Sequence, residues 1–144
     1  MDAQGRTDGL RRLGVAMALL LALLLGGCRP TAPTGEVQVL LDGQRWNGTA
    51  IGGADALRVY ITLDGAALID LPFGEPRTVE IIQPGGEKNT VSITSDAVTM
   101  ESANCENQDC VQMGAVTREN LELRVMGGFI ICLPHKVSVE VRGD

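Results

Sequence analysis

Between residues 57 and 71 the sequence alternates apolar and polar residues on both sides of one turn dipeptide. Apolar side chains stand at every second position of Leu57–Leu63 and again of Ala67–Leu71, and Asp64-Gly65 lies between the two runs. A period of two places the apolar side chains of a strand on one face, and Asp-Gly supplies the positive φ angles that a type I′ hairpin turn needs. These residues therefore predict a β-hairpin with one buried face.

The same alternation recurs along the chain, and no stretch after residue 30 carries a long apolar stripe at helical spacing. Strands with one apolar face form antiparallel sheets that are half exposed to solvent. We therefore expect an all-β fold, a compact antiparallel sandwich or partly open barrel, with one short helical turn at the cysteine segment. Further strands are predicted at Glu36–Leu41, Thr78–Ile82, Asn89–Thr94, Ala97–Glu101, Phe129–Leu133 and Lys136–Arg142. The residues expected to face inward are Val59, Ile61, Ile69, Val79, Ile81, Val91, Ile93, Val98, Val137, Val139 and Val141.

The first 28 residues have the layout of an export signal. Three arginines among residues 1–12 precede an almost wholly apolar run, Leu13–Leu25, and this order is typical of a secretory signal. The run is shorter than the about 20 apolar residues that a membrane-spanning helix needs. It leads into Gly26-Gly27-Cys28, which resembles the bacterial lipobox, and the resemblance implies cleavage before Cys28 and acylation of that cysteine. An uncleaved anchor or cleavage elsewhere is the alternative.

Export followed by acylation of Cys28 would place the protein on the extracytoplasmic face of the cell membrane. The lipid would hold it there, because each buried methylene contributes about 0.8 kcal/mol. Residues 1–27 would be the lipoprotein signal peptide, and residues 28–35, rich in Pro, Thr and Gly, a short tether. The formal charge of −6 argues against nucleic acid as a partner, since phosphates require a basic surface. The expected partners are the membrane, through the lipid anchor, and a membrane protein complex.

Three further cysteines, Cys105, Cys110 and Cys132, lie in the most distinctive polar segment of the chain. Disulfides persist outside the cytoplasm, so we expect two of the three to pair and one to remain a thiol. If Asn104 caps a helical turn over residues 106–113 that ends at Gly114, the Cα atoms of Cys105 and Cys110 are farther apart than the roughly 7 Å that a disulfide spans. Cys110 and Cys132 are then the expected pair, and Cys105 is a spare, partly exposed thiol or the alternative partner.

Two other interpretations of these cysteines stay open. Together with His135 they form a Cys3His set, which is a known ligand combination for zinc, although we favour neither a metal nor another cofactor. Alternatively, the backbone N–H groups at a helix start would stabilise the Cys105 thiolate, and the three cysteines would then take part in thiol exchange. The lack of a C-x-x-C motif argues against a thioredoxin-like redox protein.

Enzymatic catalysis has little support in this sequence. The chain has one histidine and no G-x-S-x-G motif, so a hydrolase with a Ser-His-Asp set has no foundation. The four aromatic residues are also too few for a platform that stacks nucleic-acid bases. We therefore expect no catalytic residues, and we expect a non-enzymatic accessory or binding module.

The motifs after residue 57 together resemble the NusG domain II family. They are the hairpin with Asp64-Gly65, the run Cys105-x4-Cys110-Val-x-x-Gly, and the strand Ile-Cys132-Leu-Pro-His135-Lys that continues to Glu140. The resemblance covers about residues 57–142 and implies a compact β domain there, with residues 36–56 as an extra strand pair or extension.

The family takes its name from a domain inserted in some bacterial transcription elongation factors, but nothing here resembles the rest of such a factor. The family also has stand-alone exported or membrane-anchored members. We expect an accessory or binding module held at the membrane surface, because a binding domain needs only this scaffold and its loops. The alternative is a thiol-dependent or electron-transfer accessory of a membrane redox system, acting through Cys105, Cys110 and Cys132.

Overall fold

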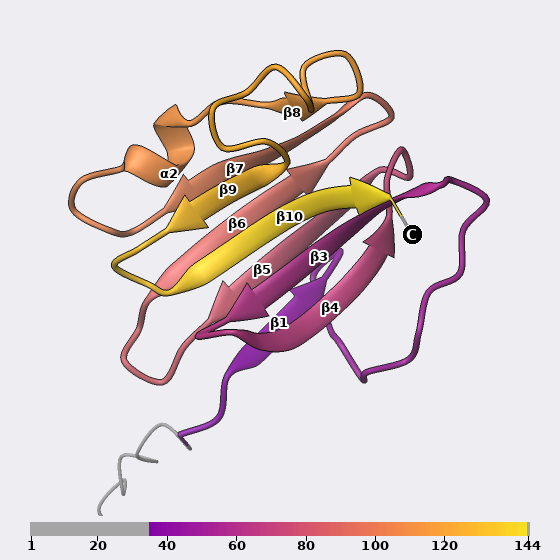
Figure 1. Ribbon diagram of the computed structural model, residues 1–144. Coiled ribbons are helices and arrows are strands. Elements are labelled where there is room, and N and C mark those ends of the chain that lie inside the picture. The colour runs from indigo at the N-terminus through magenta and orange to yellow at the C-terminus, as the bar shows by residue number, and fades with distance from the viewer. Residues whose placement is uncertain (1–34, 144) are drawn as a thin grey trace, which may run out of the picture. The chain divides into compact units, whose positions relative to one another are not determined.

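The computed structural model describes residues 35–143, which form two antiparallel sheets and one short helix (Figure 1). The predicted signal peptide and Cys28 lie outside the described residues. The first sheet contains β1 (Gln38–Leu41), β2 (Gln44–Arg45), β5 (Arg77–Ile82), β6 (Lys88–Ile93), β7 (Ala97–Ala103) and β8 (Val116–Thr117). The second contains β3 (Leu57–Leu63), β4 (Ala66–Pro72), β9 (Phe129–Cys132) and β10 (Val137–Gly143), and the helix is α2 (Asp109–Gln112).

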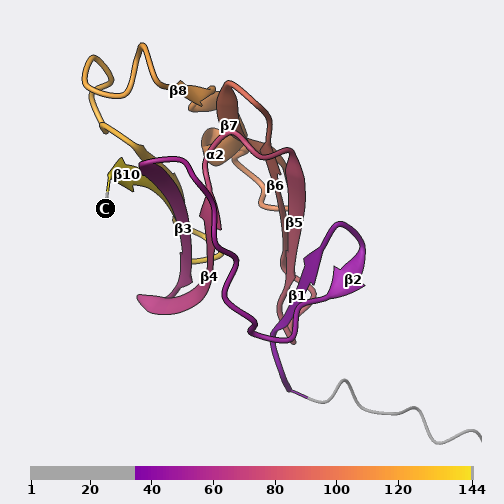
Figure 2. The ribbon, with the colours of Figure 1, turned by 90° about the vertical axis from the view of Figure 1, so that its right-hand side faces the viewer.

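The two sheets lie face to face as separate layers (Figure 2). Their strand orders are β2-β1-β5-β6-β7-β8 and β4-β3-β10-β9. Within residues 35–143 no edge strand of one sheet pairs with an edge strand of the other, so the sheets do not close into a barrel and the predicted all-β sandwich is confirmed. Each of the eleven residues expected to face inward is buried, because the alternation of each strand turns its aliphatic side chains toward the opposite layer.

The predicted hairpin at Asp64-Gly65 is confirmed. Asp64 has a φ of 50° and Gly65 a φ of 81°, so both central residues of the turn adopt the left-handed backbone that an Asp-Gly pair tolerates. Leu63 pairs with Ala66, and the register continues to Arg58 opposite Pro72 with one shift between Ile61 and Thr62. The turn thereby fixes which residues of β3 and β4 face the core.

The segment expected as an extra strand pair or extension, residues 36–56, takes part in the first sheet. β1 pairs with β5 along its whole length, from Gln38 opposite Ile82 to Leu41 opposite Val79. Asp42 and Gly43 form a second tight turn, which leads into β2, a strand of two exposed residues paired with β1. β8, also two residues long, was not predicted from the sequence.

Between residues 35 and 143, no helix is long and apolar enough to cross a membrane.

Candidate functional site

The three cysteines of the described chain come together between the end of β7, the helix α2 and the end of β9. Figure 1 shows where these three elements lie. The Sγ atoms of Cys105 and Cys110 are 3.8 Å apart. All three Sγ atoms lie within 4.8 Å of one another, and all three side chains are buried. Sequence spacing alone did not predict that the three would meet at one point.

The helical turn that holds Cys110 is shorter than the sequence suggested. α2 begins at Asp109 rather than just after Asn104, and its N-cap is Gln108, whose φ of 55° is left-handed. The Asn104 side chain is used elsewhere: its Oδ1 accepts from the N–H of Lys88 at 2.7 Å, and its Nδ2 donates to the carbonyl of Gly86 at 2.9 Å. The expected cap at Asn104 is therefore wrong. The expected end is right, because Gly114 follows the last turn with a φ of 74°.

This short helix changes the relation between Cys105 and Cys110. Cys105 lies ahead of the helix in a bent segment, so the chain folds back and brings its sulfur to that of Cys110. The expectation that helical pitch separates the two residues is wrong for this reason. Cys105 is also 5% exposed rather than partly accessible. The structure describes three thiols, and the Cys110–Cys132 pairing stays a prediction.

Burial is the largest influence on the ionisation of the central thiol. It raises the pKa of Cys110 from 9.0 to about 12, with smaller contributions from the neighbouring Cys132 and Cys105. A thiol with so high a pKa is neutral near pH 7 and is a poor nucleophile, because the thiolate is the attacking species. In this state the cluster is suited to binding or structure rather than to attack on a substrate.

His135 is buried away from the three sulfurs. Its Nδ1 lies 2.8 Å from Oδ1 of Asn89, which is fully buried, and Nδ2 of Asn89 lies 3.5 Å from Sδ of Met100. An amide oxygen accepts, so the imidazole donates from Nδ1. Within the described chain the group of convergent ligand atoms contains Cys105, Cys110 and Cys132 but not His135. The structure therefore does not assemble the Cys3His set considered from sequence.

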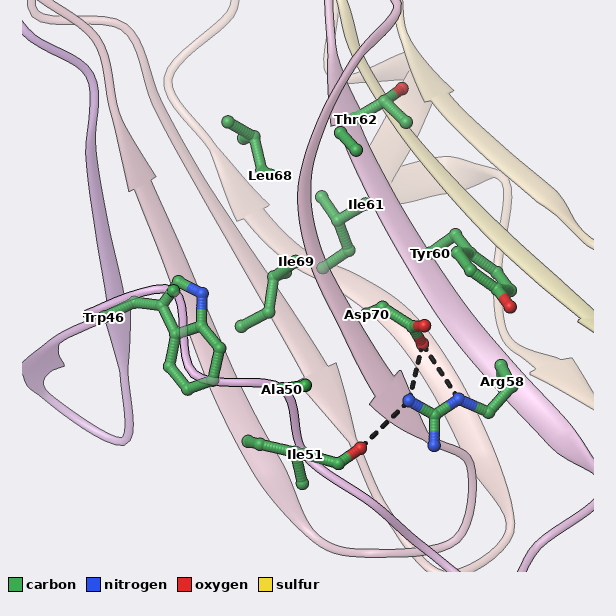
Figure 3. Close-up of a pocket in the computed structure, with 12 residues that line it drawn as sticks. Trp46, Ala50, Ile51, Arg58, Tyr60, Ile61, Thr62, Leu68, Ile69 and Asp70 are labelled. Atoms are coloured by element: carbon green, nitrogen blue, oxygen red, sulfur yellow. Dashed lines mark hydrogen bonds and ion pairs between the residues drawn. The ribbon is translucent and has the colours of Figure 1, made fainter.

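A groove of about 380 Å³ lies beside β4, between this strand and the segment that follows β2 (Figure 3). Trp46 and Ile51 of that segment face Ile69, and Ile61 and Leu68 extend the apolar wall. β4 is at the edge of its sheet, with β3 as its strand neighbour. The groove thus combines apolar side chains with the open side of a strand.

One end of the groove is polar and rigid. Arg58 donates from Nε to Oδ1 of Asp70 at 2.9 Å, its Nη2 lies 2.8 Å from the same oxygen, and Nη2 also donates to the carbonyl of Ile51 at 3.0 Å (Figure 3). The arginine thereby ties the segment after β2 to both strands of the hairpin. Its side chain is 11% exposed, whereas that of Asp70 is 45% exposed. Sequence reasoning missed this groove, and a tryptophan ahead of a glycine-rich segment was the one available signal.

Comparison with known proteins supports the family suggested by the cysteine motifs. Residues 18–144 match the family model for NusG domain II. The chain belongs to the NusG domain II family. The match includes residues 36–56, in agreement with the pairing of β1 in the sheet. No curated protein matches this member of the family.

Several solved structures are similar to this NusG domain II chain. The Lin0431 protein from Listeria innocua is 24% identical with a TM-score of 0.52, and the alignment covers 62% of this chain and 98% of that one. A DUF1312 family protein from Enterococcus faecalis V583 is 19% identical with a TM-score of 0.53, covering 61% and 98%. One from Ruminococcus gnavus is 33% identical with a TM-score of 0.49, covering 60% and 99%. The first two likenesses show the shared fold.

Proposed function

We propose that this protein is a lipid-anchored extracytoplasmic lipoprotein that acts as a non-enzymatic accessory module, and that the groove beside β4 binds an extended segment of a partner protein. The observation that carries the proposal is the edge strand β4 next to an apolar wall. Edge strands bind extended peptides by adding a strand, with backbone hydrogen bonds for affinity and side-chain pockets for specificity.

The groove has the size and composition that such binding needs. Its volume of about 380 Å³ falls in the range of roughly 300–1,000 Å³ found for ligand sites. Trp46 offers a large apolar surface, and tryptophan is among the residues that dominate binding energy at interfaces. Asp70, half exposed at the polar end, presents a carboxylate that can accept a hydrogen bond from the partner.

The anchor part of the proposal rests on Cys28, directly after the apolar run of the export signal. Mass spectrometry of protein extracted from the host membrane should show a chain that begins at Cys28 and carries acyl groups. A chain that keeps Met1, or one that begins elsewhere without lipid, contradicts the anchor while leaving the binding groove to be tested separately.

Site-specific photo-cross-linking in the host tests the groove. A photoreactive residue at Leu68 should cross-link to an extended segment of a membrane-associated protein, mapped by peptide sequencing. The same probe at Ser102, exposed on β7, is the position control. The substitution Trp46→Ala should reduce the cross-link at position 68, whereas Leu133→Ala, at an apolar residue 80% exposed, should not. Equal cross-linking at both positions, or none at 68, rejects the groove as the binding site.

A thiol-dependent role in a membrane redox system is the second candidate, and the 3.8 Å approach of Cys105 and Cys110 favours it. Thiol exchange with a partner requires an accessible sulfur. Because all three sulfurs are buried, the binding module remains the first proposal. Loss of electron transfer or thiol exchange in a folded Cys105→Ser variant, with the cross-link at position 68 unchanged, would support the second candidate.

A further inference from the structure

We propose that Cys105, Cys110 and Cys132 bind one Zn²⁺ ion as three thiolate ligands, with the fourth coordination position open toward a small pocket beside α2. The proposal rests on the convergence of three buried sulfur atoms, from the connection after β7, from α2 and from the end of β9. It is independent of the peptide groove, which lies along β4.

The sulfur positions fit the geometry of a zinc site. A Zn–S bond of about 2.3 Å in a tetrahedral arrangement places neighbouring sulfurs about 3.8 Å apart. The Sγ atoms of Cys105 and Cys110 are 3.8 Å apart, and Cys132 completes a triangle whose sides are all within 4.8 Å. Only a small movement of Cys132 is required to place all three sulfurs at bonding distance from one ion.

The donor set selects the class of ion. Thiolates favour soft or borderline ions such as Zn²⁺ and Cu⁺ and disfavour Ca²⁺ and Mg²⁺, which take oxygen ligands. Three thiolates with Zn²⁺ leave one net negative charge, whereas Cu⁺ leaves two. Burying charge in a protein interior is costly, and Cys105, Cys110 and Cys132 are all buried, so Zn²⁺ fits this site better.

A pocket of about 40 Å³ gives access to the cluster. It is lined by Cys110 and Cys132 together with Asn107 and Asp109. Nδ2 of Asn107 donates to Oδ2 of Asp109 at 2.6 Å. A water molecule needs only about 10–15 Å³, so the pocket admits an ion and a solvent ligand. Since His135 is bonded to Asn89 outside the cluster, solvent rather than imidazole fills the fourth position.

The backbone around Cys105 is held in place before any ion binds. Nε2 of Gln108 donates to the carbonyls of Ala103 and Cys105, and it lies 3.9 Å from Sγ of Cys105. Hydrogen bonds of this kind orient metal ligands in proteins and commonly alter metal affinity about 10–100-fold. Gln108 is therefore a positioning residue for Cys105.

Zn²⁺ binding and disulfide formation compete for the same sulfurs. A Cys110–Cys132 disulfide would use two of the three thiols and remove them as ligands, whereas the ion uses all three. Binding of Zn²⁺ displaces the thiol protons into solvent, with no change in oxidation state. Because the ion binds thiolates and releases their protons, the apparent affinity for zinc should rise with pH.

Metal titration of the reduced full-length chain tests the proposal. The protein carries Cys28→Ser to remove the remaining thiol and is kept in detergent under anaerobic conditions. Zn²⁺ should bind at one ion per chain in competition with a chromophoric chelator, and Co²⁺ should give the thiolate charge-transfer and visible bands of a tetrahedral site. Cys105→Ser, Cys110→Ser and Cys132→Ser each remove a ligand, so each should lower zinc affinity by more than the about 10–100-fold that loss of an outer-shell partner costs.

The substitution His135→Asn is the matched control and should leave zinc affinity and the cobalt spectrum unchanged. Circular dichroism of the metal-free variants identifies any that fail to fold. Loss of zinc binding in a folded His135→Asn variant would overturn the three-thiolate site. So would the absence of zinc uptake by the reduced protein, binding of Cu⁺ alone, or a protein that as isolated carries a disulfide and takes up no zinc after reduction.

Discussion

Among single residues, the buried pair Asn89 and His135 shows how polar side chains are accommodated in an aliphatic core. Each would cost free energy if buried alone, and the 2.8 Å hydrogen bond between Oδ1 and Nδ1 satisfies both. Gln83, the first residue after β5, adds a 2.8 Å hydrogen bond from Nε2 to the carbonyl of His135, in the turn before β10. The single histidine of the chain thus has a structural role that its sequence context could not distinguish from metal binding.

We predict that Asn89→Ala lowers the free energy of unfolding by about 1–3 kcal/mol, because the Nδ1 donor of His135 is left buried without its partner. Urea denaturation followed by circular dichroism measures the change. The control is Asn47→Ala, which removes an exposed side chain that accepts from the N–H of Thr49. Equal stability of the two variants would show that the buried pair contributes little.

Cys110 should make the stability of the reduced, metal-free protein depend on alkaline pH. Its thiol keeps its proton up to a pKa of about 12 in the fold, against 9.0 without burial. As the pH rises, the unfolded chain therefore loses this proton before the folded protein does. The contribution of the buried thiol to the free energy of unfolding is complete below pH 9 and is lost between pH 9 and 12. The slope reaches about 1.4 kcal/mol per pH unit.

The measurement compares urea unfolding of the wild type and of Cys110→Ala from pH 8 to pH 11. Every other ionisable side chain is present in both proteins, so the difference between the two slopes reports the contribution of the Cys110 thiol. Parallel slopes would show that Cys110 ionises as readily in the fold as in the unfolded chain.

Among the elements, the hairpins were the part of the fold best determined by local sequence. Alternation predicted the strands β3–β7, β9 and β10 to within a few residues, because each has a side that must be buried. The helix start was wrong because Asn104 bonds to the turn between β5 and β6, a contact distant in sequence.

The candidate sites depended on contacts between distant segments, which local patterns do not encode. The groove requires Trp46 to lie opposite Ile69. The sulfur cluster requires Cys132, on β9, to lie beside α2. The cysteines could be named as candidates from sequence, but their mutual distances follow from the packing of β7, α2 and β9.

We predict that Gly65→Ala lowers the free energy of unfolding by about 1–2 kcal/mol, because its φ of 81° places an added Cβ in the left-handed region. Gly52→Ala is the matched control, since no atom lies within 4 Å of an added Cβ there and its φ is not in that region. Thermal or urea unfolding of both variants gives the comparison. A Gly65→Ala protein as stable as the control would contradict the role of this turn.

Across the whole molecule, the second sheet is organised around β10. This strand pairs with β3 from Val137 opposite Leu63 to Gly143 opposite Leu57, and on its other side with β9. Its Val137, Val139 and Val141 lie in the core. β10 therefore joins elements that are far apart in the sequence.

A chain ending at Lys136 should fail to form the sandwich. It loses three core valines, and β3 and β9 both lose β10, the strand that lies between them. We expect no cooperative thermal transition and poor dispersion of amide signals in two-dimensional NMR. A chain ending at Gly143 is the control and should retain both. A cooperative transition in the shorter chain would show that β10 is dispensable.

The central position of β10 also has a consequence for the order of events in the cell. β10 follows every other described strand in the sequence, so β3 and β9 gain their common neighbour only after residues 137–143 have been synthesised. Pairings between distant segments are slow to form because a long loop must close first. If the chain is exported as proposed above, its second sheet is completed only after residues 137–143 have crossed the membrane.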